Sequence, residues 1–299
     1  AMSLNIGYFA DGPWSHQAFD KLINDSDILI KFICVRFDSQ DEILKKYCKK
    51  YGIDYLRDRN VNSKKFINKL SEYNCDLFVS MSFNQIFKKE IINLTKYKII
   101  NCHAGKLPFY RGRNVLNWAL INGEDEFGIT VHYVDEGIDT GDIILQDIHS
   151  ISLQDNYSTL LTRSYSGCAN ILYKAVALFK NGKVKGSKQK NMHPVGFYCT
   201  QRKIGDEIIN WDDTSINVFN FIRSICHPGP IARAFINGIE VKVNKSEIIS
   251  DSINYKCITG AILNTDKTGF LVKTMDSFIK ITEYTSNATI RVGDRFECK

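Results

Sequence analysis

The first two thirds of the chain alternate between two spacings of hydrophobic residues. Four apolar runs have the character of buried strands: 4–10, 27–37, 76–81 and 97–102. The segments between and after them have helical periodicity: 14–24, 41–51, 62–73 and 85–94. Because strands that alternate with helices require right-handed crossovers, this order predicts an α/β fold with a Rossmann-like, mostly parallel sheet.

Two further extended runs, 127–134 and 142–148, precede a long amphipathic helix predicted over 156–181. The chain is then polar and irregular, and after it come one helix near 214–226 and several short alternating runs typical of a small antiparallel sheet or barrel. We therefore predict three parts. These are an α/β domain (1–195), a linker (196–206) and a β-rich, OB-like C-terminal domain (207–299).

The net charge of +6 is unevenly distributed. Residues 207–299 carry 11 basic and 11 acidic side chains, so the excess lies in residues 1–206, with 28 basic against 22 acidic. Lysine pairs such as Lys45-Lys46 and Lys64-Lys65 fall at helix-like spacing, which is typical of solvated helix faces. Because a nucleic-acid partner would require a denser basic stripe, we expect no nucleic acid and, at most, a small anionic ligand.

Nine cysteines are scattered without a CxxC pair, which argues against structural zinc and against a disulfide framework. This usage favours a reducing, cytoplasmic compartment. No apolar run approaches the roughly 18 residues that a membrane span needs, and the first residues have no basic segment typical of a signal peptide. We expect neither a metal nor a membrane partner.

The first strand-to-helix turn, residues 11–16, bears on the choice of cofactor. Its sequence DGPWSH contains neither GxGxxG nor a P-loop. A dinucleotide bound to this turn and an NTPase activity are both disfavoured, despite the α/β pattern.

Three polar residues fall where a parallel sheet offers side chains to a ligand, at the carboxyl ends of its strands. Asn101 and His103 flank Cys102 at the end of a predicted strand, so their side chains point the same way. Asp139 lies in the glycine-rich turn 135–142, DEGIDTGD. A histidine after a strand often bonds its own loop, and an aspartate in such a turn often caps it. Spacing alone leaves these alternatives open.

The segment from Asn101 to Leu145 resembles the core signature of the folate-dependent formyltransferases. It holds the Asn-x-His pair at Asn101 and His103, an LPxxRG loop at 107–112, and Asp139 in a G-x-D-x-G turn. The later segments IINWDDTSINVFNFIRSICHPGP and GAILNTDKTGFLVKTMDSFIKITEY resemble the second domain of two-domain members. The resemblance implies a one-carbon transferase that uses 10-formyltetrahydrofolate and no metal.

Within this family, RGRNVLNW at 111–118 and SMSFNQI at 80–86 resemble the sugar-nucleotide N-formyltransferases. The segments HAGKLP at 103–108 and ITVHYVDEGIDTGDIILQ at 129–146 most resemble enzymes that act on dTDP-linked 3- or 4-amino-6-deoxy sugars. Such sugars end up in lipopolysaccharide O-antigens or other surface glycans. HPGP in place of the commoner PxPG order, and Val115 in place of proline, depart from the family's pattern. The resemblance implies a nucleotide-diphosphate amino sugar as acceptor and a homodimer formed through the second domain.

The resemblance also implies a role for each polar residue. His103 would take the proton of the attacking amine, for which a neutral imidazole is suited. The Asn101 amide would donate to the developing oxyanion, and Asp139 would orient the imidazole and favour its charged form. Backbone groups would hold the pterin of the cofactor. The predicted cofactor contacts are Ser82, Phe83, Asn84, Gln85, Ile86, Asp135 and Gly137.

Cationic and aromatic side chains near His103 and in the second domain are candidates for binding the pyrophosphate and nucleobase of the substrate. The predicted substrate contacts are Lys106, Tyr110, Arg111, Arg113, Asn114 and Trp211. Arg111 could instead hold its own loop by bonding backbone carbonyls. An aromatic residue beside an apolar run, such as Trp211, is often part of the core.

Four alternative functions remain. A methionyl-tRNA formyltransferase uses the same cofactor and trio, but the neutral second domain argues against it, because a tRNA-binding module is expected to be basic. Glycinamide ribonucleotide transformylases resemble only the first domain. A folate hydrolase would use water as the acceptor and would not need a cationic loop. A non-enzymatic binding protein is disfavoured because the trio is intact.

Overall fold

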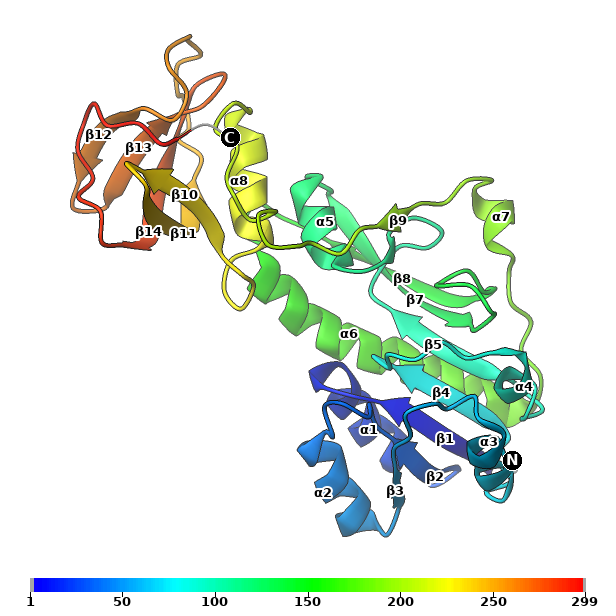
Figure 1. The fold of residues 1–299 in the computed structure, drawn as a ribbon. Coiled ribbons are helices and arrows are strands. Elements are labelled where there is room, and N and C mark those ends of the chain that lie inside the picture. The colour runs from blue at the N-terminus through cyan, green and yellow to red at the C-terminus, as the bar shows by residue number, and fades with distance from the viewer. Residues whose placement is uncertain (1–2, 298–299) are drawn as a thin grey trace. The chain divides into compact units, whose positions relative to one another are not determined.

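The computed structural model describes residues 3–297, and its fold is drawn in Figure 1. The chain forms two compact units from interleaved segments. Unit 1 contains the residues up to Arg113 together with Phe127–His149 and Thr162–Cys199. Unit 2 contains Asn114–Glu126, Ser150–Leu161 and the residues from Thr200 onward. The linker placed at 196–206 and the domain boundaries on either side of it remain predictions.

Unit 1 is built on a seven-stranded sheet with the order β3-β2-β1-β4-β5-β7-β8. Its strands are β1 (Leu4–Ala10), β2 (Ile28–Cys34), β3 (Asp54–Leu56), β4 (Leu77–Met81), β5 (Ile99–His103), β7 (Glu126–Tyr133) and β8 (Ile143–Ser150). The strands from β1 to β5 pair in parallel, and β7 runs antiparallel to β5. The prediction of a mostly parallel, Rossmann-like sheet is confirmed.

The helices that follow these strands begin and end on recognisable signals. They are α1 (Pro13–Ile23), α2 (Glu42–Tyr51), α3 (Lys64–Ser71), α4 (Lys89–Ile92), α6 (Tyr157–Leu178) and α7 (Gln189–Met192). For example, the Asp41 carboxylate accepts from the backbone N–H groups of Ile43 and Leu44 at the start of α2. At the other end, Gly52 takes the left-handed conformation that terminates this helix.

The two faces of the unit 1 sheet have separate cores. On one face Phe9, Phe32 and Phe78 pack with apolar side chains of α3 and α4. On the other, Cys102 approaches Cys168 of α6, which runs along the sheet in Figure 1. Buried on both faces, the strands can be nearly continuous apolar runs, as the sequence has them.

The strand order identifies the edge of the sheet at which a ligand would bind. β1 lies between β2 and β4, so the direction of the crossovers reverses there. Ligands of open α/β sheets bind beyond the carboxyl ends of the strands, beside this reversal. The neighbouring strands β4 and β5 carry Ser82 and His103 to that edge.

Unit 2 contains a five-stranded antiparallel sheet with the order β10-β11-β14-β13-β12. The strands are β10 (Ala232–Ile236), β11 (Ile239–Glu247), β12 (Ile262–Asp266), β13 (Gly269–Lys273) and β14 (Phe278–Ser286), and its helices are α5 (Val115–Ile121) and α8 (Ser215–Ser224). Its core contains the stacked rings of Trp211 and Phe296, together with Phe270. The predicted antiparallel sheet is present.

Three further facts concern membranes, metals and thiols. Within residues 3–297, no helix has both the length and the apolar character needed to cross a membrane. The same residues hold no group of three or more His, Cys, Asp or Glu side chains arranged to bind a metal ion. The eight described cysteines are free, and Cys298 lies outside the described residues.

Candidate active site

Asn101 and His103 lie at the carboxyl end of β5. Because side chains alternate along a strand, both share the sheet face of Ile99, which belongs to the phenylalanine-rich core. In the sheet, Asn101 pairs with His132 of β7 and His103 pairs with Thr130. The pairing of β5 with β7 therefore places a second histidine beside the predicted trio.

The imidazole of His103 is held between two oxygen acceptors. Its Nε2 lies 2.7 Å from the backbone oxygen of Tyr110, and its Nδ1 lies 3.6 Å from Oδ2 of Asp139. The side chains of His103 and Asp139 are only 10% and 12% exposed. A proton taken up by this ring would create a cation that a carboxylate and a carbonyl both stabilise.

The Asp139 carboxylate is surrounded by groups that favour its ionised form. Burial by itself raises the pKa of Asp139, but the nearby charge of His103, the hydrogen bond and charge of His132, and the backbone N–H of Gly112 lower it well below its usual range. The Gly112 nitrogen lies 2.9 Å from Oδ2, and His132 Nε2 lies 3.6 Å from Oδ1. The backbone of Asp139 is left-handed, with φ 55°.

His132 connects Asn101 to Asp139, and the sequence did not indicate it. Its Nδ1 lies 2.7 Å from the backbone oxygen of Tyr133, so this nitrogen donates. Its Nε2 faces the Asn101 amide nitrogen at 3.3 Å. The side chain is 3% exposed. Finding this residue requires the register between β5 and β7, which a single sequence does not give.

Gln189 is a second residue that the sequence did not indicate. Its Oε1 accepts from Nε and Nη2 of Arg111, at 3.1 and 2.7 Å. Its Nε2 donates to the backbone oxygens of Asp139 and Gly141, at 2.9 and 2.7 Å. This buried amide therefore fastens the Arg111 loop to the Asp139 turn. It lies in a polar segment whose pattern gave no signal of burial.

The predicted substrate contacts are not gathered around His103. The Arg111 guanidinium is bonded to the side-chain oxygen of Gln189 and lies over the Tyr198 ring, so it is held by a side-chain amide and not by carbonyls of its own loop. Tyr110 is buried against Phe197 and has φ 53°. Its contact to His103 comes from its carbonyl group, not from its ring.

The remaining predicted substrate contacts have diverse positions. Arg113 is exposed in unit 1, and Lys106 on the same loop has interaction partners. Asn114 belongs to unit 2, where its Oδ1 accepts from the Arg202 backbone. Trp211 is 2% exposed in the core of unit 2 and stacks on Phe296, so neither face of its indole is open to a nucleobase.

The loop after β4 has the features of a ring-binding segment. Arg36 donates to the backbone oxygen of Ser82 and fixes the start of the loop, and Gln85 bonds the backbone at Val61 and Asp58. Within the described residues, no hydrogen bond uses the peptide groups of residues 83–85. The Ile86 side chain is 56% exposed. Open peptide groups beside an exposed apolar side chain fit a planar heterocycle such as a pterin.

The other predicted cofactor contacts, Asp135 and Gly137, lie in the turn that carries Asp139. Asp135 Oδ1 accepts from the Gly137 nitrogen at 3.0 Å and from the Thr140 hydroxyl at 2.5 Å. Gly141 is enclosed in the same turn, because a Cβ there would lie 1.6 Å from the backbone oxygen of Tyr133. The turn is thus fixed by its own hydrogen bonds and by close backbone packing.

Two family models match the chain. The model described as formyl transferase covers residues 34–176, and the model of the formyl transferase C-terminal domain covers residues 203–292. Together they account for most of both units.

Similar sequences agree on one enzyme. The chain is 34% identical to the methionyl-tRNA formyltransferase of Fusobacterium nucleatum subsp. nucleatum, over 80% of this chain and 76% of that protein. It is 34% identical to the enzyme of Clostridium acetobutylicum, over 78% and 74% of the two chains. The enzyme of Halothermothrix orenii is 29% identical over 94% and 92%.

Similar structures include sugar formyltransferases. WlaRD, a sugar 3N-formyl transferase solved with dTDP and 5-N-formyl-THF, aligns with a TM-score of 0.70 and 22% identity, over 97% of this chain and 100% of that chain. An N-formyltransferase from Helicobacter canadensis, solved with folinic acid and dTDP-3-aminofucose, gives a TM-score of 0.69 and 23% identity, over 95% and 100%. At these identities the likeness shows the fold alone.

The predicted nucleotide-sugar acceptor is wrong. Eight relatives at 29–34% identity are all methionyl-tRNA formyltransferases. The sugar assignment depended on a resemblance in short segments, including 80–86, 103–108 and 111–118, and it led to the prediction of cations that bind a pyrophosphate. Of these cations, Arg111 is instead bonded to Gln189.

The catalytic class and the cofactor predicted from the sequence are confirmed at the level of the family. Its members transfer a one-carbon group and use 10-formyltetrahydrofolate as the donor. The match of both domain models, together with relatives at 34% identity, is decisive. The chain belongs to the formyl transferase family.

Proposed function

We propose that this protein transfers the formyl group of 10-formyltetrahydrofolate to the α-amino group of methionyl-tRNA. The observation that carries the proposal is the similarity to methionyl-tRNA formyltransferases, at 34% identity over 80% of the chain for the Fusobacterium enzyme. Charged tRNA is a cytoplasmic substrate, so the activity belongs in the cytoplasm.

The residues at the end of β5 supply the proton transfer. When bound, the cofactor supplies a formyl carbon that is open to attack by an amine. His103 takes the proton of the attacking amine, and its charged form is stabilised by Asp139 and by the Tyr110 carbonyl. The same proton can then be donated to the departing nitrogen, so the imidazole ends the cycle neutral.

Asn101 and His132 act on the developing negative charge. In the neutral form of His132, Nε2 accepts one of the two N–H groups of the Asn101 amide, at 3.3 Å. The second is left to donate to the formyl oxygen as it becomes an oxyanion. His132, which is fixed by the Tyr133 carbonyl, is a positioning residue for this amide.

The loop at 82–86 and the turn at 135–142 would hold the cofactor between them. The open peptide groups of Phe83, Asn84 and Gln85 suit the pterin edge, and Ile86 offers an apolar surface to its face. Asp135 and Gly137 keep the turn closed, so that Asp139 is presented in one geometry.

A transfer assay tests the proposal. Purified protein, 10-formyltetrahydrofolate and methionyl-tRNA should give formyl-methionyl-tRNA, detected by the mass gain of one formyl group on methionine. His103→Ala and Asp139→Asn should each lower kcat by roughly 10²–10⁴-fold, the usual range for a lost general base or its orienting partner. The exposed residues His227→Ala and Asp20→Asn serve as matched controls and should retain activity.

Other acceptors are tested in parallel. Free methionine, uncharged tRNA and dTDP- and UDP-linked amino sugars should gain no formyl group. Formylation of an amino sugar but not of methionyl-tRNA would refute the proposed acceptor and leave the roles of the trio intact.

A further inference from the structure

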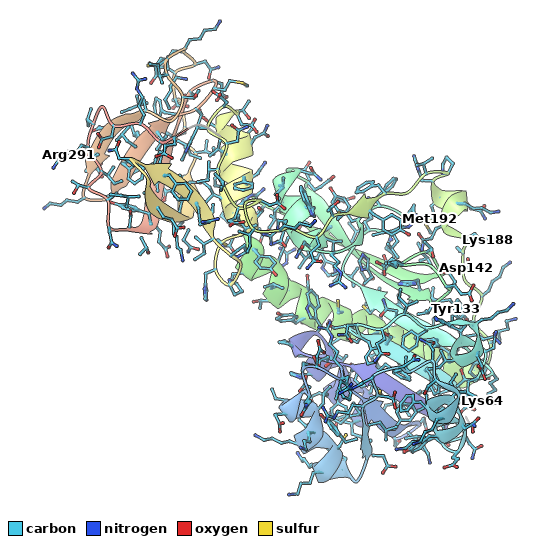
Figure 2. All side chains as sticks on the ribbon, viewed as in Figure 1. Lys64, Tyr133, Asp142, Lys188, Met192 and Arg291 are labelled. Atoms are coloured by element: carbon cyan, nitrogen blue, oxygen red, sulfur yellow. The ribbon has the colours of Figure 1, made fainter. Side chains whose placement is uncertain are left out.

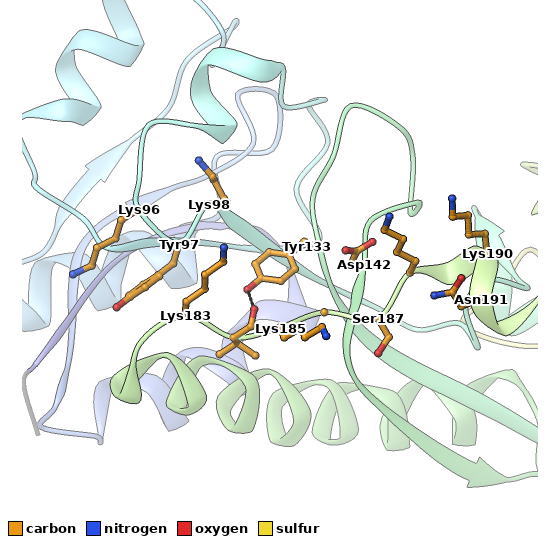
Figure 3. A pocket seen from close by; sticks show the side chains of 13 residues that line it. Lys96, Tyr97, Lys98, Tyr133, Asp142, Lys183, Lys185, Ser187, Lys190 and Asn191 are labelled. Atoms are coloured by element: carbon orange, nitrogen blue, oxygen red, sulfur yellow. Dashed lines mark hydrogen bonds between the residues drawn. The ribbon is translucent and has the colours of Figure 1, made fainter.

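An open hollow of about 1280 Å³ lies in unit 1. It is lined by residues 96–98 just before β5, by Tyr133 and Asp142 at the ends of the β7–β8 connection, and by residues 183–188, 190 and 191 after α6. Figure 3 shows lysine side chains from two distant stretches of the sequence around it, and Figure 2 places Tyr133, Asp142 and Lys188 in the same part of the molecule. We call it the lysine hollow.

The charges of the lysine hollow are nearly all of one sign. Its lining contains a single carboxylate, that of Asp142, and six lysines: Lys96, Lys98, Lys183, Lys185, Lys188 and Lys190. Lys96 pairs with Asp76 at 3.2 Å, whereas the other five form no ion pair within the described residues. Uncompensated charges of one sign around a concave surface raise the local concentration of an oppositely charged partner.

The lysines extend from a backbone that is fixed to the sheet. Ser187 and Ile143 exchange two backbone hydrogen bonds of 2.8 Å. The Tyr133 hydroxyl donates to the Val184 carbonyl. The flexible parts are therefore the side chains, and their points of attachment are set by the fold.

One buried residue ties the backbone of the lysine hollow to the turn that carries Asp139. Gln189, between Lys188 and Lys190, bonds the backbone oxygens of Asp139 and Gly141. Asp142, in the wall of the hollow, follows three residues after Asp139. The hollow lies at the amino end of β5 and His103 at its carboxyl end, so an anion that contacts both must be at least as long as this strand.

We propose that the lysine hollow binds backbone phosphates of the tRNA substrate. This inference rests on the proposed function. Lysines act as separate point charges on flexible stems, whereas a single planar anion is better matched by the fork of an arginine. A row of them suits a chain of phosphates, whose binding releases counterions and is sensitive to salt.

The test is a triple variant, Lys183→Gln, Lys185→Gln and Lys188→Gln, whose positions are all exposed. The matched control is Lys64→Gln, Lys65→Gln and Lys69→Gln, three exposed lysines of α3 that are not part of the hollow. The KM for methionyl-tRNA, the KM for 10-formyltetrahydrofolate and kcat are measured over a range of KCl concentrations.

We expect the hollow variant to raise the KM for methionyl-tRNA roughly tenfold or more near 0.1 M salt. The slope of log KM against log salt should fall by about 2, since each lost phosphate contact removes about 0.7–0.9. Its kcat and its KM for the folate should stay within about twofold of the wild type, as should all three constants of the control. Equal KM and equal slope in both variants would overturn the inference and leave the proposed function standing.

A binding measurement separates the two proposals. Fluorescence anisotropy with uncharged tRNA needs no catalysis, so it reports on the hollow even if methionyl-tRNA is not formylated. Weaker tRNA binding in the hollow variant alone would support the inference. Unchanged binding would overturn it, and so would poly-L-glutamate binding as tightly as tRNA with the same loss in the variant, because the hollow would then be a general anion surface.

Discussion

At the scale of single residues, the environment of Asp139 determines its charge. Burial opposes ionisation, but two histidines and one backbone N–H group outweigh it and lower the pKa of this carboxyl. The same contacts stabilise the folded chain as long as the carboxyl is ionised. This link between charge and stability has a measurable dependence on pH.

The unfolding free energy should reflect the lowered pKa of Asp139. In the unfolded chain this carboxyl titrates near 3.9, so its contribution is fully present above about pH 5 and is lost as the pH falls toward the lower, folded value. Asp139→Asn lacks this contribution at every pH. The difference in unfolding free energy between wild type and Asp139→Asn, measured in urea, should therefore shrink between about pH 6 and pH 3. A constant difference would show that Asp139 is not held as an anion.

The trio itself could be proposed from the sequence, because each residue lies in a segment with its own pattern. Asn101 and His103 end an apolar strand, and Asp139 lies in a glycine-rich turn. The structure brings His103 and Asp139 together. His132 and Gln189 could not be proposed, because one depends on strand register and the other on a side chain buried by distant loops.

At the scale of elements, the predicted strands of the first sheet are observed close to their predicted places, but the helix predicted over 85–94 is only Lys89–Ile92 and one short helix was missed. The strand predicted over 4–10 and the helix over 41–51 are observed at Leu4–Ala10 and Glu42–Tyr51. Helix α5 was not predicted: it has seven residues, and its first turn is not capped by a side chain. Such a helix depends on tertiary packing rather than on a local signal.

Gln189 joins the loop that carries Arg111 to the turn that carries Asp139, and its removal should affect both segments. Gln189→Leu keeps the approximate size but leaves the Arg111 guanidinium and two backbone oxygens without their partner. We expect a loss of about 1–3 kcal/mol of unfolding free energy for each group that stays buried and unpaired. Because Asp139 is released with its turn, kcat should fall as well. Chemical denaturation and steady-state kinetics measure the two effects.

Gln17→Leu is the matched control, because this glutamine is exposed on α1. It should change neither the stability nor kcat appreciably. A Gln189→Leu protein with the stability of the wild type would show that the two loops hold their positions without this amide.

At the scale of the whole molecule, the uneven distribution of charge along the sequence did not by itself indicate which surface could bind an anion. Residues 207–299 are neutral, and this argued against a tRNA substrate. The basic excess lies earlier in the chain, and five lysines of the hollow have no carboxylate partner among the described residues. A count along the sequence cannot show that Lys98 and the four lysines between positions 183 and 190 line one hollow.

Trp211 should contribute to stability and not to substrate binding. Its indole is 2% exposed and stacks on Phe296 with ring centroids 5.0 Å apart. Trp211→Ala should cost about 3–5 kcal/mol in unfolding free energy, the usual range for a buried aromatic. Trp211→Phe keeps most of the packing, so its KM for methionyl-tRNA should equal that of the wild type. A raised KM in a stable Trp211→Phe protein would contradict the structural role.

The tight packing of the turn that carries Asp139 limits which substitutions the protein can accept. A Cβ at position 141 would lie 1.6 Å from the Tyr133 carbonyl, so even alanine has no room there. Every missense change in that codon replaces glycine with a larger residue and pushes against the end of β7, which also carries His132. In a saturation mutagenesis library, position 141 should therefore be depleted of all variants, whereas position 139 should be selected for its carboxylate. Position 141 should therefore accept only glycine because it has no space for a side chain, and position 139, two residues away, should accept only residues that keep the negative charge.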